Sequence, residues 1–188
     1  MISVRIGEIR DEAIGIRTLQ LLPESSATLP AFEAGSHIDL HLGNGLVRQY
    51  SLCGDPHEPP SHYLIAVKKE PSSRGGSAAV HDLRADQRIA ISLPRNNFRL
   101  VEASTRHVLI AGGIGVTPMV AMVHTLHRAG QVFELHYFTR SAGHTAFRDL
   151  LVREPFADKV RFYHGVEDDW LARHLQTALR RSDGQDHL

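Results

Sequence analysis

Residues 107–122 read His-Val-Leu-Ile-Ala-Gly-Gly-Ile-Gly-Val-Thr-Pro-Met-Val-Ala-Met, the most informative segment of the chain. The apolar run at residues 108–111 predicts a buried parallel strand. A glycine-rich turn follows at residues 112–115. A helix is predicted next, with Thr117 as its N-cap and Pro118 at its first helical position.

A strand, a glycine turn and a helix N-terminus form the geometry that holds the pyrophosphate of a dinucleotide. Glycine lets the backbone approach the phosphates, and free N–H groups together with the helix dipole favour negative charge. The spacing here is Gly113-x-Gly115-x-x-Pro118, so proline replaces the third glycine of the usual fingerprint. An ordinary strand–helix turn fits this pattern nearly as well. Its meaning therefore depends on the flanking sequence.

Composition limits the possible classes of protein. The chain has 188 residues and no formal net charge, so no general affinity for nucleic acid or for an anionic membrane is expected. Cys53 is the only cysteine, which excludes an internal disulfide and a four-cysteine metal or iron–sulfur site. The histidine pairs lack a third ligand, and no metal site is predicted. Without a membrane-length apolar run or a signal pattern, a cytoplasmic location is expected.

The first hundred residues have the pattern of a small antiparallel barrel. Six strands are predicted, at residues 2–6, 14–22, 38–42, 46–52, 63–67 and 89–93. One short helix is predicted between the last two strands, capped by Ser77. Six strands with a single helix indicate a barrel domain over residues 1–101.

The pattern then changes to alternating strands and helices, which predicts a parallel αβα domain over residues 102–188. Three strands are expected, at residues 108–111, 132–138 and 160–164. Three helices are expected, the first closed by Gly130 and the others at residues 145–153 and 170–179. The tail at 180–187 is expected to be frayed. The fold class is thus β followed by α/β.

The pentapeptide Arg48-Gln49-Tyr50-Ser51-Leu52 lies on a predicted barrel strand. Strand alternation puts Tyr50 on one face with its neighbours at 48 and 52, and Ser51 on the other. A flavin needs an apolar plate, a hydroxyl near its reactive nitrogen and a cation for its phosphate, which this segment contains. A core tyrosine beside a solvated arginine is an equally good interpretation of the pentapeptide alone.

Four motifs occur together in one order: Arg48-x-Tyr50-Ser51-Leu52, Ser73-Arg74-Gly75-Gly76-Ser77, Pro94-Arg95-Asn96-x-Phe98 and Gly112-Gly113-Ile114-Gly115-Val116-Thr117-Pro118. With them the chain resembles the flavin-dependent reductases of the ferredoxin–NADP reductase superfamily. The likeness is greatest to the phthalate dioxygenase reductase branch, which includes vanillate demethylase reductase subunits. The resemblance implies an FMN-binding barrel followed by an NAD-binding domain. It also implies hydride transfer from NADH and delivery of single electrons to a [2Fe–2S] centre that feeds a Rieske-type oxygenase.

The resemblance also implies roles for particular residues. It assigns flavin binding to Arg48, Tyr50, Ser51, Leu52, Gly75, Gly76 and Ser77. It assigns nucleotide binding to Gly112, Gly113, Gly115, Thr117, Pro118 and Arg140. The catalytic positions are Tyr50 against the flavin ring, Ser51 near flavin N5 and Thr117 near the nicotinamide. Arg140 would lie near the adenosine ribose, where it suits a 2′-phosphate, although a surface arginine is the simpler interpretation.

The chain departs from the family in two ways. With one cysteine it cannot carry the family's [2Fe–2S] cluster, so a [2Fe–2S] ferredoxin or oxygenase component is the expected partner. The predicted nucleotide domain has three strands, without the family's Cys-Gly-Pro strand, and a truncated domain or a fragment is expected. The expected flavin is FMN rather than FAD. The expected hydride donor is NADH, with NADPH as the alternative. The alternatives are a flavin-binding non-catalytic fragment, a regulatory module or a free flavin reductase.

Overall fold

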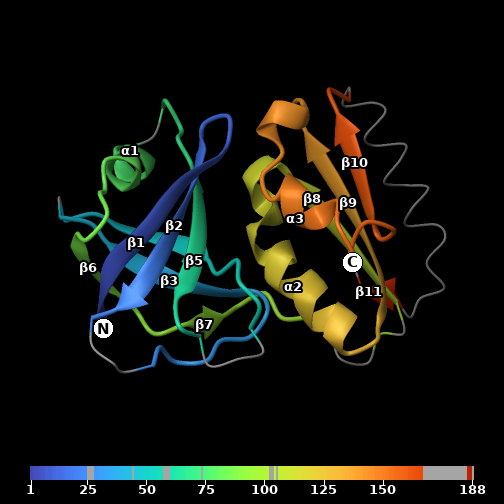
Figure 1. The fold of residues 1–188 in the computed structure, drawn as a ribbon, viewed down its shortest axis with the longest axis horizontal. Coiled ribbons are helices and arrows are strands. Elements are labelled where there is room, and N and C mark those ends of the chain that lie inside the picture. The colour runs from blue at the N-terminus through green and yellow to red at the C-terminus, as the bar shows by residue number, and fades with distance from the viewer. Residues whose placement is uncertain are drawn as a thin grey trace.

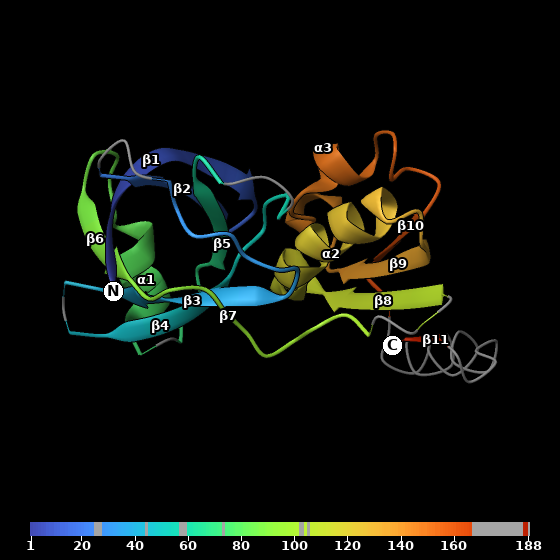
Figure 2. The ribbon, with the colours of Figure 1, turned by 90° about the horizontal axis from the view of Figure 1, so that it is seen from below.

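The computed structural model describes residues 1–24, 28–43, 45–56, 60–72, 74–101, 104, 106–166 and 186–187. Two lobes lie side by side, each built around its own sheet (Figures 1 and 2). The first sheet comes from residues 2–96 and the second from residues 106–187. None of the described helices has both the length and the apolar character needed to cross a membrane.

The first lobe is an antiparallel sheet of seven strands. Its strands are β1 (Ile2–Ala13), β2 (Ile16–Pro23), β3 (Ser36–His41), β4 (Val47–Ser51), β5 (Tyr63–Lys68), β6 (Arg88–Ile91) and β7 (Arg95–Asn96). The order is β4-β3-β6-β1-β2-β5, with β7 paired to β3. All six predicted strands are present, and β7 is an addition. Strand β1 is longer than predicted because it pairs with β6 at its start and with β2 from Val4 to Ala13.

The barrel is only partly closed. Its two end strands, β4 and β5, share no ladder among the described residues. Just beyond β4, the N–H of Cys53 donates to the C=O of Leu64 in β5, at 2.9 Å. The interior holds fully buried side chains that include Ile6, Leu21, Ile38, Leu40, Leu52, Ile65 and Ile91. The predicted barrel is therefore confirmed as an open one whose seam lies beside β4.

Helix α1 (Gly76–His81) follows β5 and precedes β6 along the chain. Its N-cap is Gly75, in the left-handed conformation with φ +83°. The prediction of Ser77 as the cap is wrong, since Ser77 lies inside the first turn, where its Oγ accepts the N–H of Glu70 at 3.0 Å. The glycine pair starts the helix earlier because glycine adopts the left-handed conformation without steric cost. Val80 and Leu83 are buried.

The second lobe is a parallel sheet in the order β10-β9-β8-β11. Its strands are β8 (Arg106–Gly112), β9 (Val132–Thr139), β10 (Val160–His164) and β11 (Asp186–His187). The helical segments are η1 (Gly113–Gly115), α2 (Val116–Arg128), η2 (Ala142–His144) and α3 (Arg148–Leu151). Helices α2 and α3 lie on one face of the sheet (Figures 1 and 2).

Several predictions for this lobe can be compared with the structure. The prediction of a three-stranded sheet is wrong, because β11 pairs with Arg106 and His107 at the start of β8, so residues 186–187 are not frayed. The helix at 145–153 is shorter than expected, since Phe147 has a left-handed backbone that prevents helix before Arg148. The helix expected at 170–179 lies outside the described residues. Gly130 follows α2 with φ +64°, so its role in closing that helix is confirmed.

Candidate functional site

The glycine turn after β8 borders open space. Gly112 is extended (φ −111°), Gly113 is left-handed (φ +50°) and Gly115 is right-handed (φ −62°). A Cβ placed on any of the three would meet no atom within 4 Å. Only Gly113 therefore needs to be glycine for its own backbone. At the other two positions the absent side chain leaves room for a ligand to approach the main chain, at the carboxyl end of a parallel strand.

Helix α2 begins at Val116, two residues earlier than the sequence predicts. The turn coils into η1, so Gly115 is the N-cap and Thr117 is already helical. The prediction of Thr117 as the N-cap is wrong. Its Oγ1 donates instead to the C=O of Ile114 at 3.0 Å, and the residue is buried. Pro118 is the third residue of α2, still within the first turn, where its missing N–H costs no helical hydrogen bond.

Strand β4 carries the pentapeptide in the predicted alternation. Arg48 is opposite Leu40 and Tyr50 is opposite Ile38, both inward-facing partners on β3, whereas Ser51 is opposite His37. Tyr50 is half-buried, and this burial raises the pKa of its phenol while the charge of Arg48 opposes the rise. Leu52, just beyond the strand, is fully buried. Tyr50 and Ser51 therefore lie on opposite faces at the seam of the open barrel.

Arg48 packs against the start of α1. A Cβ on Gly76 would lie 2.4 Å from Arg48 Nε and 2.9 Å from its Cγ, so only glycine lets the arginine cross the helix here. Arg48 Nη1 also donates to the C=O of Val47 at 2.8 Å. This packing places a guanidinium beside the first-turn backbone N–H groups of α1. Both kinds of donor suit a phosphate. Ser73, the first residue of the predicted phosphate motif, lies outside the described residues.

Arg140 follows the last residue of β9 and is exposed. Phe138 of that strand is opposite Gly112 of β8, so the arginine and the glycine turn share the carboxyl edge of the sheet. The adjacent Thr139 hydroxyl is hydrogen-bonded to His164 Nδ1 at 2.8 Å and to Thr145 at 2.9 Å. The structure therefore brings the predicted nucleotide residues to one edge.

The described residues join the two lobes in more than one place. After β4, the carboxylate of Asp55 accepts from Arg128 Nη2 of α2 at 2.7 Å. Near the end of β1, the carboxylate of Glu12 accepts the N–H of Phe147 at 2.7 Å. Segment η1 lies beside β5. The glycine turn therefore lies against β5, one of the two seam strands of the first lobe.

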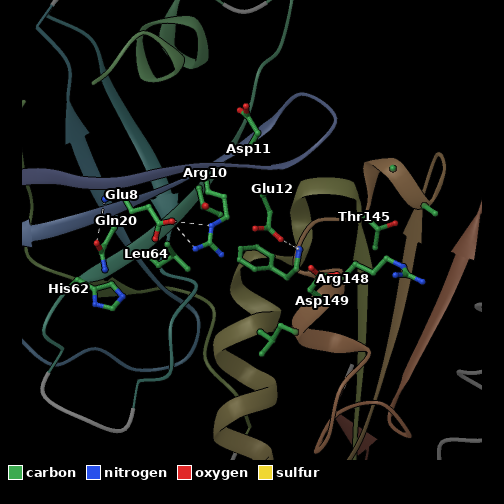
Figure 3. Close-up of a pocket in the computed structure, with 15 residues that line it drawn as sticks. Glu8, Arg10, Asp11, Glu12, Gln20, His62, Leu64, Thr145, Arg148 and Asp149 are labelled. Atoms are coloured by element: carbon green, nitrogen blue, oxygen red, sulfur yellow. Dashed lines mark hydrogen bonds and ion pairs between the residues drawn. The ribbon is translucent and has the colours of Figure 1, made fainter. Parts of the chain in front are cut away.

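A pocket of about 540 Å³ lies between the lobes on the β1 side (Figure 3). Its walls come from β1, β2 and the segment 142–150, and none of the predicted site residues lines it. The cross-lobe contact of Glu12 belongs to this pocket. Sequence analysis missed it because the two partners are 135 residues apart and neither belongs to a recognisable motif.

An open antiparallel barrel joined to a parallel sheet, with a phosphate-type glycine turn at their boundary, defines the ferredoxin-reductase class of two-domain proteins. A solved phthalate dioxygenase reductase, described as a modular structure for electron transfer from pyridine nucleotides to [2Fe–2S], superposes with a TM-score of 0.86 at 31% identity. The match covers 99% of this chain and 66% of that one. A search of protein-family models finds no match.

Proteins of known function show the same relationship. The vanillate O-demethylase oxidoreductase of Pseudomonas sp. (strain HR199 / DSM 7063) is 48% identical over 164 residues, which is 87% of this chain and 51% of that protein. The tert-butanol monooxygenase / tert-amyl alcohol desaturase reductase subunit of Aquincola tertiaricarbonis is 45% identical over 161 residues, 85% of this chain and 47% of that protein. The chain thus spans about half the length of these relatives. It belongs to the phthalate dioxygenase reductase branch of the ferredoxin–NADP reductase superfamily, which confirms the resemblance.

Proposed function

We propose that the chain is a flavin-dependent reductase that takes hydride from NADH and passes single electrons to a [2Fe–2S] centre on another domain or chain. That centre would feed a Rieske-type aromatic-ring oxygenase or demethylase. One observation carries the proposal: open space borders Gly112, Gly113 and Gly115 where η1 lies beside β5 of the first lobe. A nucleotide bound there would lie next to β5, which borders the same seam as β4, the strand with the flavin motif. The names of the relatives, which are reductase subunits of oxygenase systems, support the same conclusion.

The first lobe, residues 1–101, is proposed to bind the flavin. Arg48 would neutralise its phosphate, with Gly75, Gly76 and Ser77 offering backbone N–H groups and a hydroxyl. The close fit of Arg48 over Gly76 supports this role, because a side chain at 76 would displace the guanidinium. Tyr50 and Leu52 would pack beside the ring, and Ser51 would donate near N5. The family resemblance favours FMN over FAD.

The second lobe, residues 102–188, is proposed to bind NADH. Gly113 and Gly115 would border the pyrophosphate, with Gly112 and Pro118 on either side of them. Thr117 would lie near the nicotinamide and Arg140 near the adenosine ribose, where its charge would also tolerate NADPH. A bound flavin supplies the capacity to accept two electrons as hydride and release them singly. The protein's part is to hold the nicotinamide against that ring, without an acid or base of its own.

Purified protein tests the proposal directly. It should be yellow and iron-free, and anaerobic mixing with NADH should bleach the flavin absorbance within seconds. Reduction of cytochrome c should require an added [2Fe–2S] ferredoxin or oxygenase component. A colourless protein that cannot be reconstituted with FMN or FAD would overturn the proposal. Tightly bound flavin that resists millimolar NADH would point to a non-catalytic binding module, and weakly retained but reducible flavin to a free flavin reductase.

A further inference from the structure

Glu12 lies near the end of β1 in the first lobe, and its side chain reaches the second. Its Oε1 accepts the N–H of Phe147 at 2.7 Å (Figure 3). Two residues further on, the N–H of Ile14 donates to the C=O of Gly143 at 2.8 Å. A Cβ on Gly143 would lie 2.9 Å from Ile14 Cδ1, so the two segments fit closely. Residues 12–14 therefore hold the segment 143–147 by two hydrogen bonds and a close contact.

The segment that Glu12 holds has a backbone that needs outside support. Phe147 has φ +56° and ψ +21°, a left-handed conformation that is sterically unfavourable for a bulky side chain. Its ring is buried, with 6% of the residue exposed, and its N–H is bonded to Glu12. The N–H of the preceding Ala146 donates to the Tyr137 hydroxyl at 3.2 Å. The strained turn is thus supported by a sheet residue below it and by Glu12 from the other lobe.

The carboxylate of Glu12 lies close to the buried sheet as well. Burial raises the pKa of the Tyr137 phenol, and the negative charge of Glu12 adds to the rise. A carboxylate so placed gives a charge-assisted hydrogen bond in partly water-excluded surroundings, which is stronger than a bond between neutral groups. The contact is therefore suited to fixing a position rather than merely covering a surface.

The held segment leads directly to the nucleotide-binding edge. It lies shortly after Arg140, which directly follows β9, and β9 pairs with β8, which ends at the glycine turn. We propose that Glu12 is a positioning residue for hydride transfer, which fixes the nucleotide-binding edge of the second lobe relative to the flavin-binding lobe. This inference rests on the proposed function. Hydride transfer needs reacting atoms about 3–3.5 Å apart, and a displacement of about 1 Å can slow a reaction roughly a hundredfold.

The second cross-lobe contact explains why losing Glu12 would matter. Asp55 and Arg128 join the lobes at the C-terminal end of α2, away from the Glu12 contact. This pair and the contacts of residues 12–14 lie apart, so together they resist rotation of one lobe against the other. Removing Glu12 leaves the Ile14–Gly143 hydrogen bond but releases the N–H of Phe147 and its strained turn, so the nicotinamide would sample a wider range of distances from the flavin.

Glu8 offers a matched control. It is four residues before Glu12 on β1 and lines the same pocket (Figure 3). Its carboxylate pairs with Arg10 of the same strand at 2.8 Å, within the first lobe. Glu8→Ala therefore removes a carboxylate from the same pocket without loosening the contact between the lobes. Glu12→Gln keeps an oxygen that can accept the Phe147 N–H, and Glu12→Asp keeps the charge but shortens the reach.

The experiment uses the full chain loaded with flavin, as wild type and as the variants Glu12→Ala, Glu12→Gln, Glu12→Asp and Glu8→Ala. Flavin affinity is measured by fluorescence titration, and flavin reduction by anaerobic stopped flow at saturating NADH and, separately, with dithionite. We expect Glu12→Ala and Glu12→Asp to slow reduction by NADH at least tenfold. Their flavin affinity should stay within twofold, and their reduction by dithionite should be unchanged. Glu12→Gln should stay within threefold of the wild-type rate, and Glu8→Ala should match it.

Three results would overturn the role of Glu12. The first is a wild-type NADH rate in Glu12→Ala. The second is equal slowing in Glu12→Gln and Glu12→Ala, and the third is equal slowing in Glu8→Ala. If Glu12→Ala loses its flavin through misfolding, Glu12→Asp decides: a folded, flavin-loaded protein with a wild-type rate refutes the inference. Failure of the proposed function looks different, because wild type itself would then be reduced by dithionite and not by NADH.

Discussion

Gly115→Ala separates stability from nucleotide binding in a single substitution. Gly115 has right-handed backbone angles, φ −62° and ψ −7°, and a Cβ there would meet no atom within 4 Å. Alanine therefore fits without strain and restricts the unfolded chain, which stabilises the fold by about 0.4–1 kcal/mol. Alanine is also a poorer N-cap than glycine, which costs roughly 1 kcal/mol. The two effects oppose each other, so the free energy of unfolding should change by less than about 1 kcal/mol.

The effect on activity should be much larger. The new methyl group projects into the space that the pyrophosphate is proposed to occupy. A displacement of the bound nucleotide by about 1 Å is enough to lower the rate of hydride transfer roughly a hundredfold. We therefore expect reduction of the flavin by NADH to fall by about that factor, while flavin affinity and reduction by dithionite stay at wild-type levels.

Urea unfolding, flavin titration and stopped-flow reduction measure these quantities on one preparation. Gly43→Ala is the control, because a Cβ at this exposed turn position in the first lobe also meets no atom within 4 Å. It should change neither the rate nor the affinity. A Gly115→Ala protein that is reduced at the wild-type rate with unchanged affinity for NADH would refute the reasoning, since the open space would then serve no nucleotide.

Three further predictions concern the first lobe. Gly76→Ala should weaken flavin affinity roughly tenfold, because the new Cβ would lie 2.4 Å from Arg48 Nε and displace a donor to the flavin phosphate. Fluorescence titration measures the affinity, and an unchanged value would contradict the prediction. Ser51→Ala should slow flavin reduction by NADH by about tenfold without loss of flavin, and equal rates in stopped flow would argue against a bond near N5. Arg95 donates a hydrogen bond that lowers the pKa of Asp39. Asp39 therefore stabilises the fold fully at pH values above the usual carboxyl pKa, and this stabilisation is lost as the pH falls through the lowered pKa. Asp39→Asn should cost about 1 kcal/mol in urea unfolding at pH 7 and progressively less towards pH 2; a constant difference would be inconsistent with this pair.

The strands and the motif residues could be predicted because their signals are local. In β3, Ile38 and Leu40 alternate with polar residues, and the strand forms at Ser36–His41 with both side chains fully buried. In the second lobe, the strand at Val160–His164 has the predicted bounds. The order of the four motifs was enough to indicate the family, since each motif is a short segment whose spacing does not depend on the rest of the fold.

Features that depend on distant partners could not be predicted. Strand β7 forms because Arg95 and Asn96 pair with His37 and Ser36 of β3, and nothing in the local sequence pattern indicates a strand. The cap of α2 was misplaced by two residues because the glycine turn coils into a 3₁₀ segment before Thr117. The Glu12–Phe147 bond needs both lobes to be assembled. In each case the physical cause is tertiary contact rather than local propensity.

The chain's single cysteine can report local opening of the seam between β4 and β5. Cys53 lies at that seam, 2% exposed, and its burial raises the pKa of the thiol. Thiol reagents attack the thiolate, so modification requires the seam to open. With one cysteine in the whole sequence, every modified molecule records one such opening. The rate of labelling therefore measures how often the first lobe opens locally at the seam. A ligand bound on β4 lowers this rate in proportion to the fraction of molecules that it occupies.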